Sequence, residues 1–121
     1  MRYKKLQRAG VDVSAVAVGT WAIGGSQYGE VNDQDSVTAI RAMIDCGVNL
    51  VDTAPIYGNG HSEEVVGKAL QGLRDKVLLC TKFGTYNSSY TGDVIYDCRY
   101  DSVFAFCENS MRRLKTDYLD F

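Results

Sequence analysis

Three side chains have the chemistry and spacing of an acid–base group: Asp52, Tyr57 and Lys82. Asp52 ends an apolar run typical of a buried strand, and Lys82 directly follows a second such run, VLLCT. Adjacent parallel strands lie about 4.8 Å apart, and their C-terminal ends meet at one edge of the sheet. We therefore expect Asp52 and Lys82 to meet there, with Tyr57 on the loop between them.

The chemistry of such a group would be proton donation to a substrate oxygen. A phenol with its ordinary pKa of about 10 is a poor acid at neutral pH unless a nearby cation stabilises its anion. Lys82 can supply that cation, and Asp52 can orient it. The spacing alone leaves two alternatives open: an Asp52–Lys82 pair that merely ties two strands together, or Asp52 as a turn residue.

The other candidate residues lie in two loops. Trp21, in GTWAIGG, is either a half-buried loop aromatic or a flat wall of a ligand pocket. His61 precedes a helix start, so we expect it to be exposed or hydrogen-bonded within its loop. The glycines do not match G-x-G-x-x-G, and there is no G-K-[ST] phosphate motif.

The elements that must position these residues alternate along the chain. Residues 2–7 and 11–14 predict a hairpin, and apolar runs predict strands at 15–18, 48–51, 77–81 and 118–121. Helices are predicted from residue 35 to 46, capped by Asp33 or Asp35, from an N-cap at Ser62, and from Asp101 or Ser102. Residues 84–100 predict a polar loop without a clear period. This order indicates a parallel sheet, either doubly wound or part of an α/β barrel.

Composition excludes several classes of protein. The chain has 121 residues, 45% of them hydrophobic, and a net charge of −2. It has no basic stripe for nucleic acid and no apolar run long enough to cross a membrane. The four cysteines show no C-x-x-C pair and no histidine at metal-ligand spacing. We expect reduced core thiols, no metal site and a cytoplasmic protein.

Four segments, taken together, resemble the aldo-keto reductase superfamily: GTWAIGG, NLVDTAPIYGNGHSEEVVGKAL, KVLLCTKFG and MRRLKTDYLDF. The resemblance implies the N-terminal part of a (β/α)8 TIM barrel with a leading β-hairpin, about four parallel strands and three helices. It also implies NADPH as cofactor, bound without a Rossmann domain, and reduction of aldehydes or ketones by hydride transfer.

The resemblance implies a role for each matching residue. Tyr57 matches the proton donor, Lys82 the lysine that makes it a usable acid, and Asp52 the carboxylate paired with that lysine. The residues implied to bind the cofactor are Gly19, Thr20, Trp21 and Asp52, and those in the substrate pocket are Trp21 and Tyr57.

The resemblance also implies that residues 1–121 are a partial barrel domain, truncated within or near the fourth strand. The family's catalytic histidine would follow the segment TDYLDF. We therefore expect the isolated chain to be inactive or nearly so, and to be part of a longer reductase or to self-associate over its open edges. The alternative is a regulatory subunit of the same fold, like the cytoplasmic subunits of some potassium channels.

Overall fold

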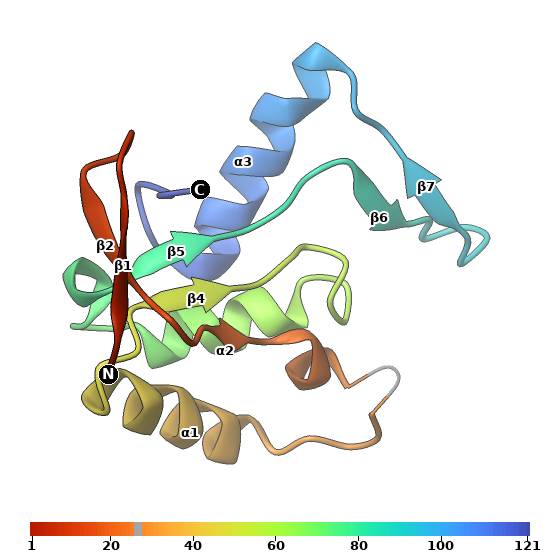
Figure 1. Ribbon diagram of the computed structural model, residues 1–121. Helices are drawn as coiled ribbons and strands as arrows, with labels where there is room; N and C mark the ends of the chain where they lie inside the picture. The colour runs from red at the N-terminus through yellow and green to blue at the C-terminus, as the bar shows by residue number, and fades with distance from the viewer. Residues whose placement is uncertain (26–27) are drawn as a thin grey trace.

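The chain begins with the predicted hairpin. The computed structural model describes residues 1–25 and 28–121. Strands β1 (Tyr3–Leu6) and β2 (Val11–Ser14) pair antiparallel, and the hairpin stands beside the rest of the molecule (Figure 1). Asn49 ties it to the main sheet: its Oδ1 accepts from Ser14 N at 2.8 Å, and its Nδ2 donates to Asp12 O at 2.8 Å.

A parallel sheet carries the candidate residues. Its strands are β3 (Val18–Gly19), β4 (Leu50–Asp52) and β5 (Leu78–Cys80), in the order β3-β4-β5. The predicted fourth strand has begun to pair with β5 at residues 118–121. Phe121 N donates to Leu79 O and Thr81 N donates to Phe121 O, which is the hydrogen-bond pattern of a parallel pair. The Asp120 carboxylate accepts a hydrogen bond from Leu79 N at 2.8 Å, so a side chain replaces one ladder bond, and a full fourth strand stays a prediction.

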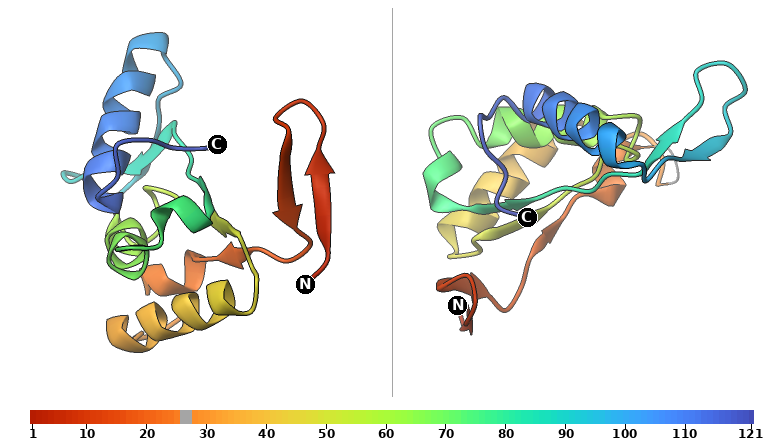
Figure 2. Two further views of the ribbon diagram at one scale, coloured as in Figure 1. Left: turned by 90° about the vertical axis from the view of Figure 1, so that its left-hand side faces the viewer. Right: turned by 90° about the horizontal axis from the view of Figure 1, so that it is seen from above.

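Three α-helices cover one face of this sheet (Figure 2). They are α1 (Asp33–Asp45), α2 (His61–Ala69) and α3 (Tyr100–Leu114), with short 3₁₀ turns η1 (Trp21–Gly24) and η2 (Arg74–Lys76). Val18, Val51 and Leu79 lie side by side across the sheet and point into the buried core beneath the helices. Because side chains alternate along a strand, Leu50, Asp52 and Cys80 face the opposite side.

The helices start at different residues from those predicted. The N-cap of α1 is Asn32, whose Oδ1 accepts from Gln34 N and Asp35 N, so Asp33 and Asp35 lie inside the helix. Helix α2 is capped by Gly60, with φ of 92°, which leaves Ser62 in the first turn. Helix α3 follows Arg99 and includes Asp101 and Ser102.

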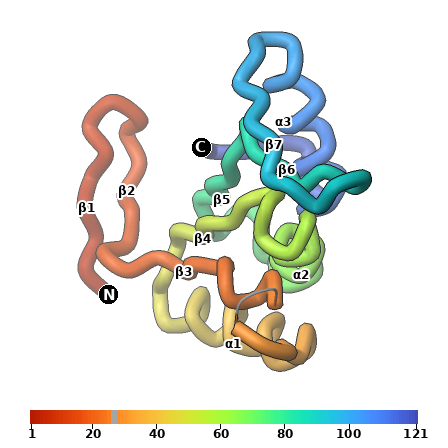
Figure 3. The backbone as a smooth tube through the Cα atoms, turned by 90° about the vertical axis from the view of Figure 1, so that its right-hand side faces the viewer, coloured from red at the N-terminus to blue at the C-terminus, as the bar shows by residue number. Residues whose placement is uncertain are grey.

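The predicted loop at residues 84–100 contains a second hairpin instead. Strands β6 (Thr85–Asn87) and β7 (Val94–Tyr96) pair antiparallel, and they project from the body of the molecule, to the right in Figure 1 and toward the viewer in Figure 3. The Ser88 side chain holds the turn by accepting from Tyr90 N and Thr91 N. Strands of three residues are too short to show a period of two in the sequence, which explains the wrong prediction.

The cysteines are free thiols, as predicted, but they are not core residues. Cys46 and Cys98 are exposed, and Cys80 and Cys107 are partly buried. No helix in the described ranges is both long and apolar enough to cross a membrane.

Candidate active site

The register of the sheet brings Asp52 and Lys82 together. Asp52 pairs with Cys80, and Lys82 lies two residues beyond Cys80, just past the end of β5, so in an extended chain its side chain is on the same face as that of Cys80. Lys82 Nζ lies 2.8 Å from Asp52 Oδ1 and 2.9 Å from Oδ2, and it donates to Thr53 O at 3.0 Å. The contact predicted from strand spacing is confirmed.

The ammonium of Lys82 is held in its charged form. Burial lowers the pKa of Lys82, but the hydrogen-bonded Asp52 carboxylate and the nearby Tyr57 hydroxyl outweigh it, so the pKa lies above its usual range. The two side chains of the ion pair are 45% and 37% exposed, so the pair sits at a surface that a ligand can reach. This arrangement provides a fixed positive charge at the edge of the sheet.

Tyr57 lies on the loop of residues 53–60, and its ring faces Lys82. The ring centroid is 5.0 Å from Lys82 Nζ. Trp21 also stacks on Tyr57, with ring centroids 6.2 Å apart and planes inclined by 25°. Trp21 is 47% exposed, so one part of its indole remains open to solvent. The structure thus brings together four of the candidate side chains that the sequence singled out: Asp52, Tyr57, Lys82 and Trp21.

Tyr28 is a neighbour that sequence reasoning missed. Its ring meets Trp21 edge-on, with centroids 5.6 Å apart and an interplanar angle of 81°. Tyr28 is 59% exposed. It comes seven residues after Trp21 in the sequence, and no period or motif marks it there.

Two glycines allow the loops of Trp21 and Tyr57 to touch. A Cβ atom at Gly24 would lie 2.6 Å from Gly58 N and 2.7 Å from Tyr57 C. A Cβ at Gly58 would collide with the Gly24 backbone, and Gly58 has φ of 60°. Both positions therefore require glycine, and their contact sets the distance between the two aromatic rings.

A buried hydroxyl cluster lies among the starts of these loops. Ser62 Oγ lies 2.9 Å from Thr20 O, 2.8 Å from Thr20 Oγ1 and 3.2 Å from Thr53 Oγ1. Thr20 Oγ1 donates to Asp52 O at 3.0 Å. Thr20 is fully buried, so its side chain holds the backbone of Asp52 and is not open to a ligand. Of the residues predicted to contact the cofactor in this loop, Gly19 and Trp21 are the exposed ones.

His61 is hydrogen-bonded, as predicted, but across two helices. Its Nε2 lies 2.8 Å from Asp33 Oδ1, and Lys68 Nζ lies 3.1 Å from Asp33 Oδ2. His61 thus belongs to the contact between α1 and α2 rather than to the Asp52–Lys82 pair.

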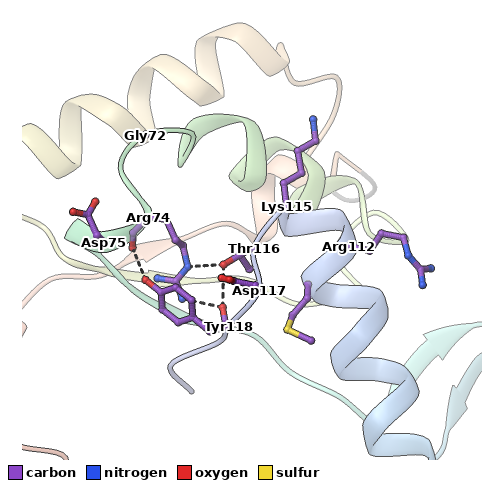
Figure 4. Close-up of a pocket in the computed structure, with 9 residues that line it drawn as sticks. Gly72, Arg74, Asp75, Arg112, Lys115, Thr116, Asp117 and Tyr118 are labelled. Atoms are coloured by element: carbon purple, nitrogen blue, oxygen red, sulfur yellow. Dashed lines mark hydrogen bonds between the residues drawn. The ribbon is translucent and has the colours of Figure 1, made fainter.

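An open pocket of about 760 Å³ lies between the segment that precedes β5 and the C-terminal end of α3, and its lining includes Arg74, Lys115 and Tyr118 (Figure 4). It is organised by Arg74, which donates to Thr116 Oγ1, Val77 O and Tyr118 O and packs 3.8 Å from the centre of the Tyr118 ring. Arg74 already has these partners, so we assign it to fixing residues 116–120 against β5.

Comparison with known proteins establishes the family. The profile of the aldo/keto reductase family matches residues 15–121, and the chain belongs to that family. It is 41% identical over 122 residues to the aldo-keto reductase YhdN of Bacillus subtilis (strain 168), which covers 99% of this chain and 36% of the relative. It is 40% identical over 121 residues to the methylglyoxal reductase YeaE of Escherichia coli (strain K12), with 99% and 38% covered.

A solved structure agrees. An aldo/keto reductase from Klebsiella pneumoniae in complex with NADP and acetate is 40% identical, with a TM-score of 0.71 over 92% of this chain and 35% of that chain. The three strand–helix units therefore correspond to part of an aldo-keto reductase barrel. The chain spans little more than a third of the length of these relatives, at 36% and 38% of the two curated ones.

Proposed function

We propose that these residues form part of an NADPH-dependent oxidoreductase that reduces aldehydes or ketones to alcohols. One observation carries the proposal: the Lys82 ammonium, fixed by Asp52 at 2.8 Å, lies 5.0 Å from the centre of the Tyr57 ring. The names of the curated relatives, an aldo-keto reductase and a methylglyoxal reductase, support a carbonyl substrate. The Klebsiella complex with NADP supports a nicotinamide cofactor.

Each side chain has a role in the proposed reaction. The Tyr57 hydroxyl donates a proton to the carbonyl oxygen, and the Lys82 cation stabilises the phenolate that remains. Asp52 keeps Lys82 in place and charged. NADPH would supply the hydride. Exposed Trp21 offers a flat face for a planar ring, and Gly19 has open space where a Cβ would lie, so the residues present fit such a cofactor.

A chimera tests the proposal directly. Residues 1–121 would replace the matching segment of Bacillus subtilis YhdN, and NADPH-dependent reduction of small aldehydes would be followed by absorbance. We expect turnover in the chimera and a loss of about 10²–10⁴-fold in kcat for Tyr57→Phe. Tyr90→Phe, at a side chain that is 97% exposed, is the control and should match the parent. Turnover that survives Tyr57→Phe would refute the assignment of the proton donor.

For residues 1–121 alone, outside such a chimera, we propose little or no reductase activity. The catalytic residues that the resemblance implies in this segment are Asp52, Tyr57 and Lys82. The inner face of the sheet also bounds an apolar cavity of about 540 Å³, lined by Leu6, Val13, Ala17, Leu50, Asp52, Cys80 and Phe121. We propose that the rest of a longer chain or a second copy covers this face. Sedimentation showing a stable, soluble monomer at micromolar concentration would contradict this.

The alternative of a channel regulatory subunit is not favoured by the relatives, whose names are those of reductases. The proposed location is the cytoplasm, which the free thiols support.

A further inference from the structure

Glu63 is a fully buried carboxylate in the first turn of α2. A carboxylate in the first turn of a helix is commonly exposed and interacts with the helix dipole. Instead, Oε1 accepts from Thr81 Oγ1 at 2.7 Å, and Oε2 accepts from Arg113 Nε at 2.6 Å. One carboxylate therefore connects the exit of β5 with the C-terminal turn of α3.

The backbone is shaped to admit this pair. A Cβ at Gly60 would lie 2.5 Å from Arg113 Cδ, and a Cβ at Gly67 would lie 2.8 Å from Arg113 O and Leu114 C. Glycines before and within α2 thus let α3 approach closely enough for Arg113 to reach Glu63. A buried ion pair adds little stability relative to apolar residues of the same volume. The role of the Glu63–Arg113 pair therefore has to be sought in the residues that it holds in place.

We propose that Glu63 is a positioning residue for Lys82 and that it acts through the Thr81 hydroxyl. Strand β5 ends at Cys80, so pairing with β4 no longer sets the direction of the chain at Lys82. Successive side chains of an extended chain point to opposite faces. Fixing Thr81 against α2 therefore aims Lys82 at the other face, where Asp52 and Thr53 O receive its ammonium.

This inference deepens the proposed function, on which the importance of Lys82 rests, but it can be tested without turnover. The measurement is an NMR titration of Lys82 in the 121-residue chain with labelled lysine side chains, assigned with Lys82→Arg. Thr81→Val removes the hydroxyl and keeps the shape, so we expect the pKa of Lys82 to fall as its contacts with Asp52 loosen. Thr81→Ser restores the hydroxyl and should titrate like the wild type.

The controls separate positioning from mere stability. Thr38→Val removes a hydroxyl that donates to Gln34 O at an exposed position of α1, and it should leave the titration of Lys82 unchanged. A folded Thr81→Val protein with a lower Tm but an unaltered Lys82 titration would overturn the inference. If Thr81→Val does not fold, Glu63→Gln is measured in its place, and the same expectation applies. An inactive chimera with a shifted Lys82 would reject the proposed function and leave the positioning role standing.

Discussion

Replacing Gly24 with alanine would put a methyl group between the two loops that carry Trp21 and Tyr57. The new Cβ would lie 2.6 Å from Gly58 N and 2.7 Å from Tyr57 C, where ordinary contacts begin at 3.4 Å. Both neighbours are backbone atoms, so no side chain can rotate away. The loops must therefore separate by about 0.7–0.8 Å, which is the difference between those distances and 3.4 Å.

This separation should cost stability and change the surroundings of the indole. Forcing an extra methyl group into a packed contact costs about 1–3 kcal/mol, and we expect a loss near the middle of that range, about 2 kcal/mol. For a chain of this size, the corresponding fall in Tm is roughly 5–10 °C. Trp21 is the only tryptophan, so its fluorescence reports on the Trp21–Tyr57 stack directly.

Gly19→Ala is the matched control. A Cβ at Gly19 meets nothing within 4 Å, and neither Gly19 nor Gly24 has a positive φ. Gly19→Ala should therefore keep the emission spectrum and the unfolding midpoint of the wild type or raise the latter slightly. Urea unfolding followed by Trp21 emission compares the three proteins. If Gly24→Ala matched Gly19→Ala in both midpoint and spectrum, the close contact would not set the ring geometry.

Two further predictions concern titratable groups outside Tyr57 and Lys82. Burial raises the pKa of Asp33, but hydrogen bonds with Lys68 and His61 outweigh it and hold that pKa below its usual range. The Asp33 carboxylate therefore stabilises the folded state above about pH 4, and this contribution is lost as the pH falls through its lower pKa in the folded protein. The difference in Tm between wild type and Asp33→Asn should therefore disappear in acid. A difference that stays constant would contradict this. Burial, and then the Asp52 carboxylate, raise the pKa of the Cys80 thiol. Mass spectrometry should show Cys80 alkylated after the exposed cysteines, and Asp52→Asn should speed its reaction; an unchanged rate would exclude the influence of Asp52.

The sequence was sufficient to predict the contact at the centre of the site. One apolar run ends on Asp52, and the other ends just before Lys82. Because adjacent parallel strands lie at a fixed distance from each other, the contact between Asp52 and Lys82 follows from strand geometry alone. The leading hairpin was also predictable, because two short strands flank a glycine turn. Both features depend on local sequence pattern and on the spacing between adjacent strands, which is the same in all β-sheets.

The supporting contacts could not be predicted, because they depend on partners far away in the chain. Ser62 has the residue type of an N-cap, yet its hydroxyl is drawn to Thr20, 42 residues away. Glu63 suits an exposed first turn, and only the approach of Arg113 across 50 residues buries it. A local pattern predicts the preference of a residue, and tertiary packing then overrides it.

The register of the parallel sheet also has a consequence for the order of folding. Val51 pairs with Val18, 33 positions earlier (51 − 18), and with Leu79, 28 positions later (79 − 51). Each pairing must close a long loop before any contact compensates for the lost chain entropy. The two hairpins close over a few residues and form within about 1–10 μs. The edge that carries Asp52 and Lys82 is therefore assembled late, after the local elements that flank it already exist.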